Sequence, residues 1–151
     1  MSGASVLVLG VNSYVELDDA DDMAKERYGP RIDAWTALTA TKREATLMQA
    51  TRDIDAVAWL GYKTERDQAL EFPRGDSSIP GVVQEACLEQ ACHLALTASS
   101  AERREELSRA GVRSASVGGI SEHYAGGSAA PLCYRAMALL RRYHVTGAVL
   151  I

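Results

Sequence analysis

Hydrophobic positions recur at helical spacing along most of the chain. Apolar residues follow one another three and four positions apart in residues 17–28, 41–60, 80–98 and 131–143, with a shorter segment at residues 32–38 around Trp35. This spacing places them along one side of an α-helix, with polar residues on the other. The pattern predicts a mainly α-helical protein, a small helical bundle.

Local signals predict where several helices begin and end. Thr41 and Glu44 have the spacing of a capping box, so we expect a helix to start there and to end at Gly61. Pro80 is suited to the first position of the next helix because its missing N–H is not needed there. A second capping box at residues 99–102 predicts a separate charged helix over residues 100–110.

The remaining segments lack helical periodicity. Residues 4–9 are apolar and end at Gly10, which predicts a short strand or an extended arm at the N-terminus. Residues 62–79 form a long connection in which Phe72-Pro73 predicts an aromatic-anchored turn. Because so long a loop is uncommon in a small domain, we expect it to pack on the helices or on a neighbouring subunit.

Two further features lie near the C-terminus. Residues 112–117 and 120–124 flank Gly118-Gly119, a pattern typical of a β-hairpin with a tight turn. The chain then closes with four apolar residues, 148–151, beyond Gly147. Two interpretations of this tail remain open: it docks as a strand on its own domain, or it adds a strand to another subunit.

Composition narrows the class of protein. With 151 residues, 47% hydrophobic residues and a formal net charge of −4, the chain is expected to be one folded domain without a membrane span. The N-terminus has no basic region ahead of its apolar stretch, so we expect no secretory signal and synthesis in the cytoplasm. Net acidity argues against a dedicated duplex-DNA binder.

Candidate chemistry is sparse. The sequence contains no phosphate-loop, dinucleotide, nucleophile-elbow or zinc-protease motif, and His93, His123 and His144 lie on different predicted elements. The three cysteines have no metal-binding spacing, and we interpret them as buried thiols. We therefore expect no enzyme activity, no metal and no cofactor.

Several segments, in this order, resemble the head-to-tail adaptor (connector) proteins of tailed bacteriophages, a family often labelled DnaT-like single-stranded-DNA-binding proteins. They are the turn and acidic helix start at residues 12–20, the aromatic-glycine-basic step at 59–63, the Gln-Ala-Leu-x-aromatic-Pro-Arg block at 68–74 and the helix start at 79–83. The resemblance spans residues 11–143.

The resemblance implies a structural virion protein made in the host cytoplasm. Such adaptors form a ring, typically of twelve subunits, beneath the portal, where they extend the channel for double-stranded DNA and offer a surface to the stopper or tail-completion protein. Phe72 departs mildly from the family, in which tryptophan is commoner at that place. The chain would then be a single adaptor domain, with an N-terminal arm at residues 1–11 and a tail at 144–151.

Two sets of residues are candidates for binding. For subunit or portal contacts, besides residues 62–79 and helix 100–110, we expect the hairpin and the tail to contribute Val112, Arg113, Val117, Gly118, Gly119, Ile120, Tyr124, Ala148, Val149, Leu150 and Ile151. The alternative function, binding of single-stranded nucleic acid, needs stacking aromatics beside basic groups. The sequence offers one such grouping: Tyr134, Arg135, Arg141, Arg142 and Tyr143.

Overall fold

The computed structural model describes residues 5–109 and 132–144, with the backbone alone for residues 102–109. This part of the chain is mainly α-helical, as expected. It contains α1 (Leu17–Ala24), α2 (Pro30–Ala37), α3 (Ala40–Asp55), α4 (Gly81–Arg109), α5 (Tyr134–Leu139) and the short 3₁₀ helix η2 (Arg141–Tyr143). Strand-like pairing in these residues is limited to two isolated β-bridges, Leu9 with Ser13 and Trp59 with His144.

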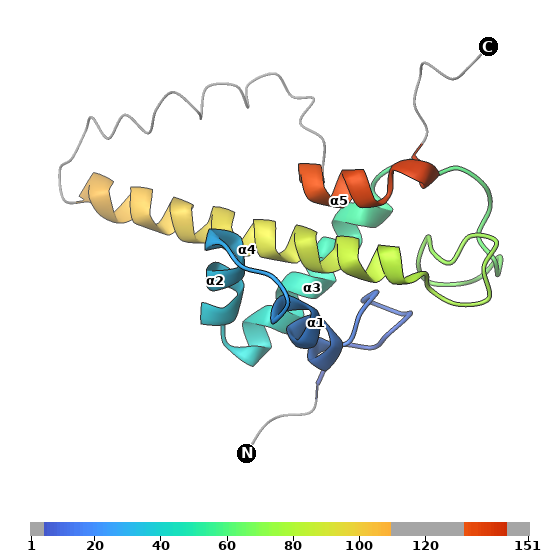
Figure 1. Ribbon diagram of the computed structural model, residues 1–151, viewed down its shortest axis with the longest axis horizontal. Helices are drawn as coiled ribbons and strands as arrows, with labels where there is room; N and C mark the ends of the chain where they lie inside the picture. The colour runs from blue at the N-terminus through green and yellow to red at the C-terminus, as the bar shows by residue number, and fades with distance from the viewer. Residues whose placement is uncertain (1–4, 110–131, 145–151) are drawn as a thin grey trace, which may run out of the picture.

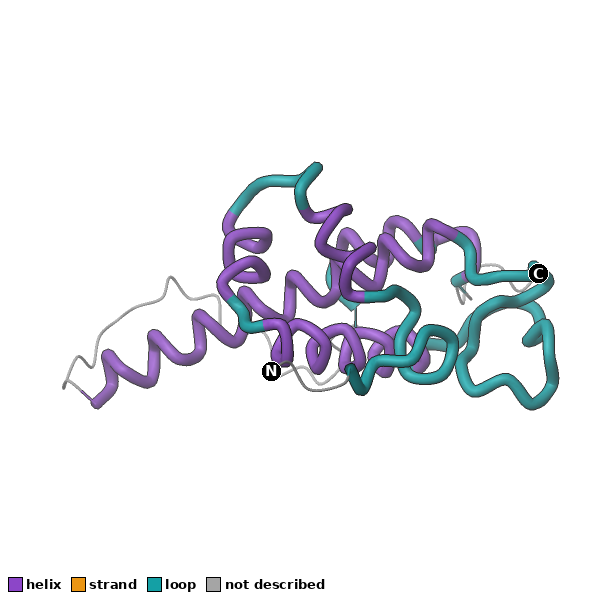
Figure 2. Tube along the Cα trace, turned by 90° about the horizontal axis from the view of Figure 1, so that it is seen from below, coloured by secondary structure: helices purple, strands orange, loops and turns teal. Residues whose placement is uncertain are grey.

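The long helix α4 is the centre of the fold. Helices α1, α2 and α3 pack against it, and α5 packs against it on another side (Figure 1). Seen from the perpendicular direction, the C-terminal end of α4 extends well beyond the other helices (Figure 2). The bundle is therefore built around one half of α4 only.

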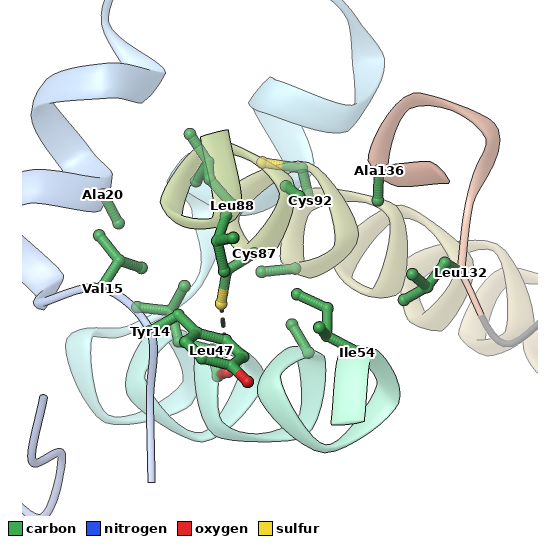
Figure 3. Packing of buried hydrophobic residues seen from close by; sticks show 14 of the residues in the cluster. Tyr14, Val15, Ala20, Leu47, Ile54, Cys87, Leu88, Cys92, Leu132 and Ala136 are labelled. Carbon is green, nitrogen blue, oxygen red and sulfur yellow. Dashed lines mark hydrogen bonds between the residues drawn. The ribbon is translucent and has the colours of Figure 1, made fainter. Parts of the chain in front are cut away.

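The hydrophobic core lies between that half of α4 and its neighbours (Figure 3). Helix α4 contributes Leu88 together with several small side chains, and α3 contributes Leu47 and Ile54. Small residues on α4, such as Ala91 at 0% exposure, let the surrounding helices approach closely. Ala136 of α5 completes the core from the other side.

The first helix is shorter than expected, since α1 ends at Ala24 and not near residue 28. Arg27 folds back and donates a hydrogen bond from Nη1 to the Met23 carbonyl at 2.8 Å, a carbonyl near the helix end that also accepts the Glu26 N–H at 3.1 Å. Gly29 then has φ of +125°, a conformation that favours glycine, and Pro30 opens α2.

Both predicted limits of α3 were wrong. The N-terminal cap is Thr39, whose hydroxyl accepts the Lys42 N–H at 3.2 Å, so the helix begins at Ala40 and ahead of the predicted capping box. The helix ends at Asp55 and not at Gly61. The Trp59 indole donates to the Ile54 carbonyl at 2.7 Å, and this bond replaces the next helical turn.

The prediction of a separate helix over residues 100–110 was also wrong, because α4 is continuous from Gly81 to Arg109. Ser99 and Ser100 are exposed within it. Serine favours a cap only where the backbone leaves the helix. No glycine or proline follows Gly81 in this segment to make it leave. The start of α4 agrees to within one residue with the expectation from Pro80.

The last helix begins at Tyr134, whereas Pro131, the expected start, lies outside the described residues. The predicted β-hairpin around Gly118-Gly119 lies outside them too, and the described part of the chain offers no support for it. No helix in that part is long and apolar enough to cross a membrane.

Candidate functional site

The hairpin and tail residues predicted to contact partners fall outside the part of the chain that the structure describes, whereas residues 62–79 and most of the predicted helix 100–110 lie inside it. The residues outside it are Val112, Arg113, Val117, Gly118, Gly119, Ile120 and Tyr124 around the predicted hairpin, and Ala148, Val149, Leu150 and Ile151 in the tail. Their role stays a prediction. The candidate surfaces that can be built from the described residues lie on α4, at the N-terminus and on α5 with η2.

The first surface is the projecting half of α4, residues 97–109. Ala95 is the last side chain of α4 found buried among those described, Leu96 is half-buried, and every side chain from Thr97 to Ala101 is exposed. At about 1.5 Å per residue, this segment extends the helix by roughly 20 Å. An isolated helix of that length is marginal in water. A helix end so placed is suited to contact another chain.

The second surface is the N-terminal arm, residues 5–11. Val6, Val8, Leu9 and Val11 are 62%, 49%, 41% and 55% exposed. Leu7, in contrast, packs against the core. The arm thus holds one apolar side chain inward and presents the others to solvent, which is an unusual use of four large apolar residues in so short a segment.

The connection at residues 62–79 packs on its own domain. The sequence had left open whether it packs on the helices or on a neighbouring subunit. The Arg74 side chain is 9% exposed, and its Nε donates to the Leu60 carbonyl at 2.8 Å while Nη1 contacts the Glu71 carboxylate at 2.9 Å. Phe72 anchors the turn and is 1% exposed. Tyr62, at 91% exposure, is the large side chain that this connection offers to solvent.

Phe72 is the centre of an aromatic cluster that joins distant segments. Its ring lies edge-on to Tyr14, Trp59 and Tyr143, with centroid separations of 5.9, 5.4 and 5.1 Å. The Tyr14 hydroxyl donates to the Asp55 carboxylate and accepts the Phe72 N–H at 3.1 Å.

Electrostatics agree with a structural role for this cluster. Burial, followed by the nearby Asp55 charge, raises the pKa of Tyr14 far above its ordinary value. Burial also raises the pKa of Asp55, and the hydrogen bonds from Tyr14 and from the Glu71 amide offset that rise only in part. The Tyr14 hydroxyl and the Asp55 carboxylate therefore bond each other and the backbone of the connection at residues 62–79, which is a structural role.

A buried ionic cluster joins α4 to Arg27, which lies between α1 and α2, and to Arg31 in the first turn of α2. Glu89 is 5% exposed, and its carboxylate contacts Arg27 Nε at 2.9 Å and Arg31 Nε at 2.8 Å. Arg27 also reaches Glu85 at 3.0 Å. Burial alone would raise the pKa of Glu89, but the hydrogen bonds and charges of Arg31 and Arg27 outweigh it and hold the pKa below the ordinary value. The carboxylate is thus a structural ion.

The thiols and imidazoles do not assemble into a site within the described residues. Burial raises the pKa of Cys87 to about 11 and that of Cys92 to about 12, which makes both thiols poor nucleophiles. His93 is exposed on α4, whereas His144 stacks edge-on against the Trp59 ring at 5.9 Å. No group of three or more metal-ligating side chains occurs in the part of the chain described.

The grouping proposed for nucleic acid is partly assembled. Tyr134, Arg135, Arg141 and Arg142 are exposed on α5 and η2, and Tyr134 is 86% exposed. Tyr143 instead contributes to the aromatic cluster, with the Arg142 guanidinium carbon 6.0 Å from its ring centroid. Residues 132–144 contain no acidic residue. We call Tyr134, Arg135, Arg141 and Arg142 the basic end.

Comparison with known proteins adds one finding. A family model described as "Putative DnaT-like ssDNA binding protein" matches residues 4–150, nearly the whole chain. The chain belongs to this family. No curated protein and no solved structure matches the chain. Membership agrees with the label expected from the sequence resemblance, and it says nothing about a head-to-tail adaptor.

Sequence reasoning placed a subunit contact on residues 100–110 and an arm at residues 1–11, but it missed the continuity of α4 and the exposure of the arm. The continuity of α4 had a signal, the absence of glycine and proline between Gly81 and Arg109, but the serine pair was given more weight. The exposed N-terminal arm had none, because an apolar run in a sequence is equally compatible with a buried strand. The ionic cluster at Glu89 joins residues about sixty positions apart, and no local pattern announces it.

Proposed function

We propose that this protein is a structural ring subunit, an adaptor that sits beneath the portal of a tailed bacteriophage and connects the DNA-filled head to the stopper or tail. The observation that carries the proposal is the projecting half of α4. A small bundle with a complete core keeps a helix of roughly 20 Å outside that core, and such a helix is stabilised when another chain packs against it.

The arrangement suits head-to-tail assembly. The projecting half of α4 lies at one end of the molecule, away from α1, α3 and the connection at residues 62–79 (Figure 1). A contact between two different surfaces of identical chains repeats by rotation and closes into a ring when the angle permits. The resemblance to phage adaptors points to twelve copies around a channel, and the net charge of −4 suits a wall past which DNA slides.

The direct experiment mixes the purified full chain with a portal protein from a tailed bacteriophage genome that encodes this chain and images the mixture by negative stain. We expect a ring of this protein seated on the portal, and a sedimentation coefficient higher than that of either component. A mixture that sediments as separate portal and monomer at every salt concentration tested would contradict the adaptor function.

Binding of single-stranded DNA is a second candidate, favoured by the basic end and by the description of the family. Tyr134 offers a stacking surface, and the neighbouring guanidinium groups offer charge to phosphates. The test measures fluorescence anisotropy of a labelled oligonucleotide at low and high salt. This function predicts salt-dependent binding that Arg141→Glu/Arg142→Glu abolishes.

A matched control uses exposed arginines elsewhere on the bundle. Arg52→Glu/Arg66→Glu makes the same change in net charge at positions on α3 and in the loop at 62–79. If both double variants weaken oligonucleotide binding equally, the attraction is a general charge effect and the basic end is not a binding site. No binding by the unchanged protein at low salt dismisses this function altogether.

A further inference from the structure

The N-terminal arm is held open by one side chain. The Asn12 amide donates from Nδ2 to the Val6 carbonyl at 2.9 Å, and its Oδ1 accepts the Val8 N–H at 2.7 Å. Backbone groups two residues apart that face the same partner are the arrangement of an extended strand. Asn12 therefore occupies one edge of the arm as a neighbouring strand would.

The other edge of the arm is only partly used by the described residues, since the Leu7 N–H donates to Ser5 Oγ at 3.2 Å. Within residues 5–109 and 132–144, neither the Leu9 N–H nor the Leu7 carbonyl makes a hydrogen bond. Val6 and Val8 are exposed beside this edge. An open strand edge with exposed apolar side chains is a template for another strand.

A hollow continues from the base of the arm. It is lined by Val11 and Asn12, by the C-terminal turn of α3 up to Ala56, and by Leu70. Asp55, which also lines it, binds the Tyr14 hydroxyl. The hollow thus connects the arm to the aromatic cluster.

The C-terminal segment leaves the fold close to this hollow. The Leu60 N–H donates to the Tyr143 carbonyl at 2.7 Å, which ties the end of η2 to the loop. Tyr143 contacts Phe72 at 5.1 Å between ring centroids, and Phe72 contacts Tyr14 at 5.9 Å. The Tyr143 and Tyr14 rings are therefore no more than about 11 Å apart.

The length of the remaining chain decides whether the tail of the same chain can reach the arm. Residues 145–151 follow His144, and seven extended residues span up to about 24 Å. A tether that short gives the tail an effective concentration at its own arm in the millimolar range, far above that of a second copy in dilute solution. Val149 and Ile151 are β-branched, which favours a strand.

We propose that the C-terminal tail, residues 148–151, docks in the free protein on the N-terminal arm of its own chain, along the open edge and the adjoining hollow. The tail covers the exposed valines and supplies the missing hydrogen-bond partners. This inference does not depend on the ring function.

Disulfide trapping tests the docking in the full-length protein. Val11→Cys is combined in turn with Val149→Cys, Leu150→Cys and Ile151→Cys, so that several registers that place the tail beside the base of the arm bring one pair within disulfide distance. All variants carry Cys133→Ser, while Cys87 and Cys92 are buried and unreactive. We expect at least one pair to form an intramolecular disulfide in the monomer at a rate independent of protein concentration.

The control pair joins the same tail position to the projecting half of α4, as Thr97→Cys with Leu150→Cys. It should oxidise at least about tenfold more slowly, because Thr97 lies beyond the packed bundle. Disulfide-linked dimers whose yield rises with concentration would show that the tail serves a second copy and would overturn the proposal. Equal rates for control and test pairs would overturn it as well.

Hydrogen exchange of the chain lacking residues 148–151 gives an independent readout. Removal of the tail should speed exchange of the Leu9 amide about tenfold or more, since that N–H loses its partner. Amides in the core half of α4 should exchange as before, which shows that the truncated chain still folds. Unchanged exchange at Leu9 would contradict the docking, whatever the result of the portal experiment.

Discussion

The two halves of α4 have the same secondary structure and opposite surroundings. Residues 83–95, the packed half, bury Val83, Leu88, Ala91 and other side chains among four neighbouring helices. Residues 97–101 in the projecting half bury none. The backbone is helical throughout. Local sequence is therefore enough to make both halves helical, whereas only the packed half contributes buried side chains to the stability of the fold.

This difference predicts that the packed half contributes to folding and the projecting half to contacts with another chain. A change in the packed half should alter the free energy of unfolding, because it disturbs the core. The same change in the projecting half should leave that free energy nearly unaltered and should act only on contacts with another chain. Matched pairs of substitutions along α4 can therefore separate folding from assembly.

The largest expected effect is that of Glu89→Gln. It removes a carboxylate from two arginines whose side chains are only 20% and 18% exposed, and we expect a loss of about 2 kcal/mol in the free energy of unfolding. Glu85→Gln is the control, since Glu85 contacts Arg27 alone and is 42% exposed; it should cost less than about 1 kcal/mol. Urea denaturation measures both. Equal losses in the two variants would mean that the buried position of Glu89 does not strengthen its ion pairs.

The Glu89 pair also predicts a pH dependence. The folded pKa of Glu89 lies below its ordinary value, so the folded state binds fewer protons there than the unfolded state does. Its stabilisation is complete above the unfolded pKa of about 4.3 and is lost as the pH falls through the lower folded pKa. Acid denaturation should therefore be less steep for Glu89→Gln than for the unchanged protein. An identical acid limb would contradict the stated role of Glu89.

The second pair places one substitution in each half of α4. Ala91→Leu inserts a large side chain where the alanine is 0% exposed and should cost about 1–3 kcal/mol. Ala98→Leu is made at an exposed position with nearly equal helix propensity and should change stability by less than about 0.5 kcal/mol. If the projecting half contacts another chain, Ala98→Leu should still weaken assembly with the portal. Loss of stability in both variants would show that residue 98 packs within the monomer.

The sequence allowed the helical class to be predicted, because it depends on local periodicity. The burial predicted for the three thiols is confirmed for Cys87 and Cys92, whereas Cys133 is only partly buried. Helix limits failed where tertiary contacts decide them. The Trp59 indole ends α3 early by bonding the Ile54 carbonyl, and the Arg27 side chain does the same for α1. Neither contact has a signature in the residues nearby.

The candidate surfaces were less predictable than the fold. Val6 and Val8 are exposed although Leu7 between them packs against the core, and an apolar sequence by itself predicts burial. The basic end was found because arginine and tyrosine recur together in residues 134–143. Tyr143 does not join the exposed part of this grouping, since its ring packs on Phe72, a contact between residues far apart in the chain.

The smallest expected effect separates helix formation from stability most directly. Ala101→Gly lies in the projecting half, where glycine weakens a helix locally by about 1 kcal/mol but touches no core contact. We expect the urea midpoint to stay within error while amides from about residue 97 onward exchange several-fold faster. Ala86→Gly, its partner in the packed half, lowers the midpoint because Ala86 is 0% exposed. If Ala101→Gly lowered the midpoint as much, the two halves of α4 would unfold as one unit, and the projecting half would be part of the monomer's own stability.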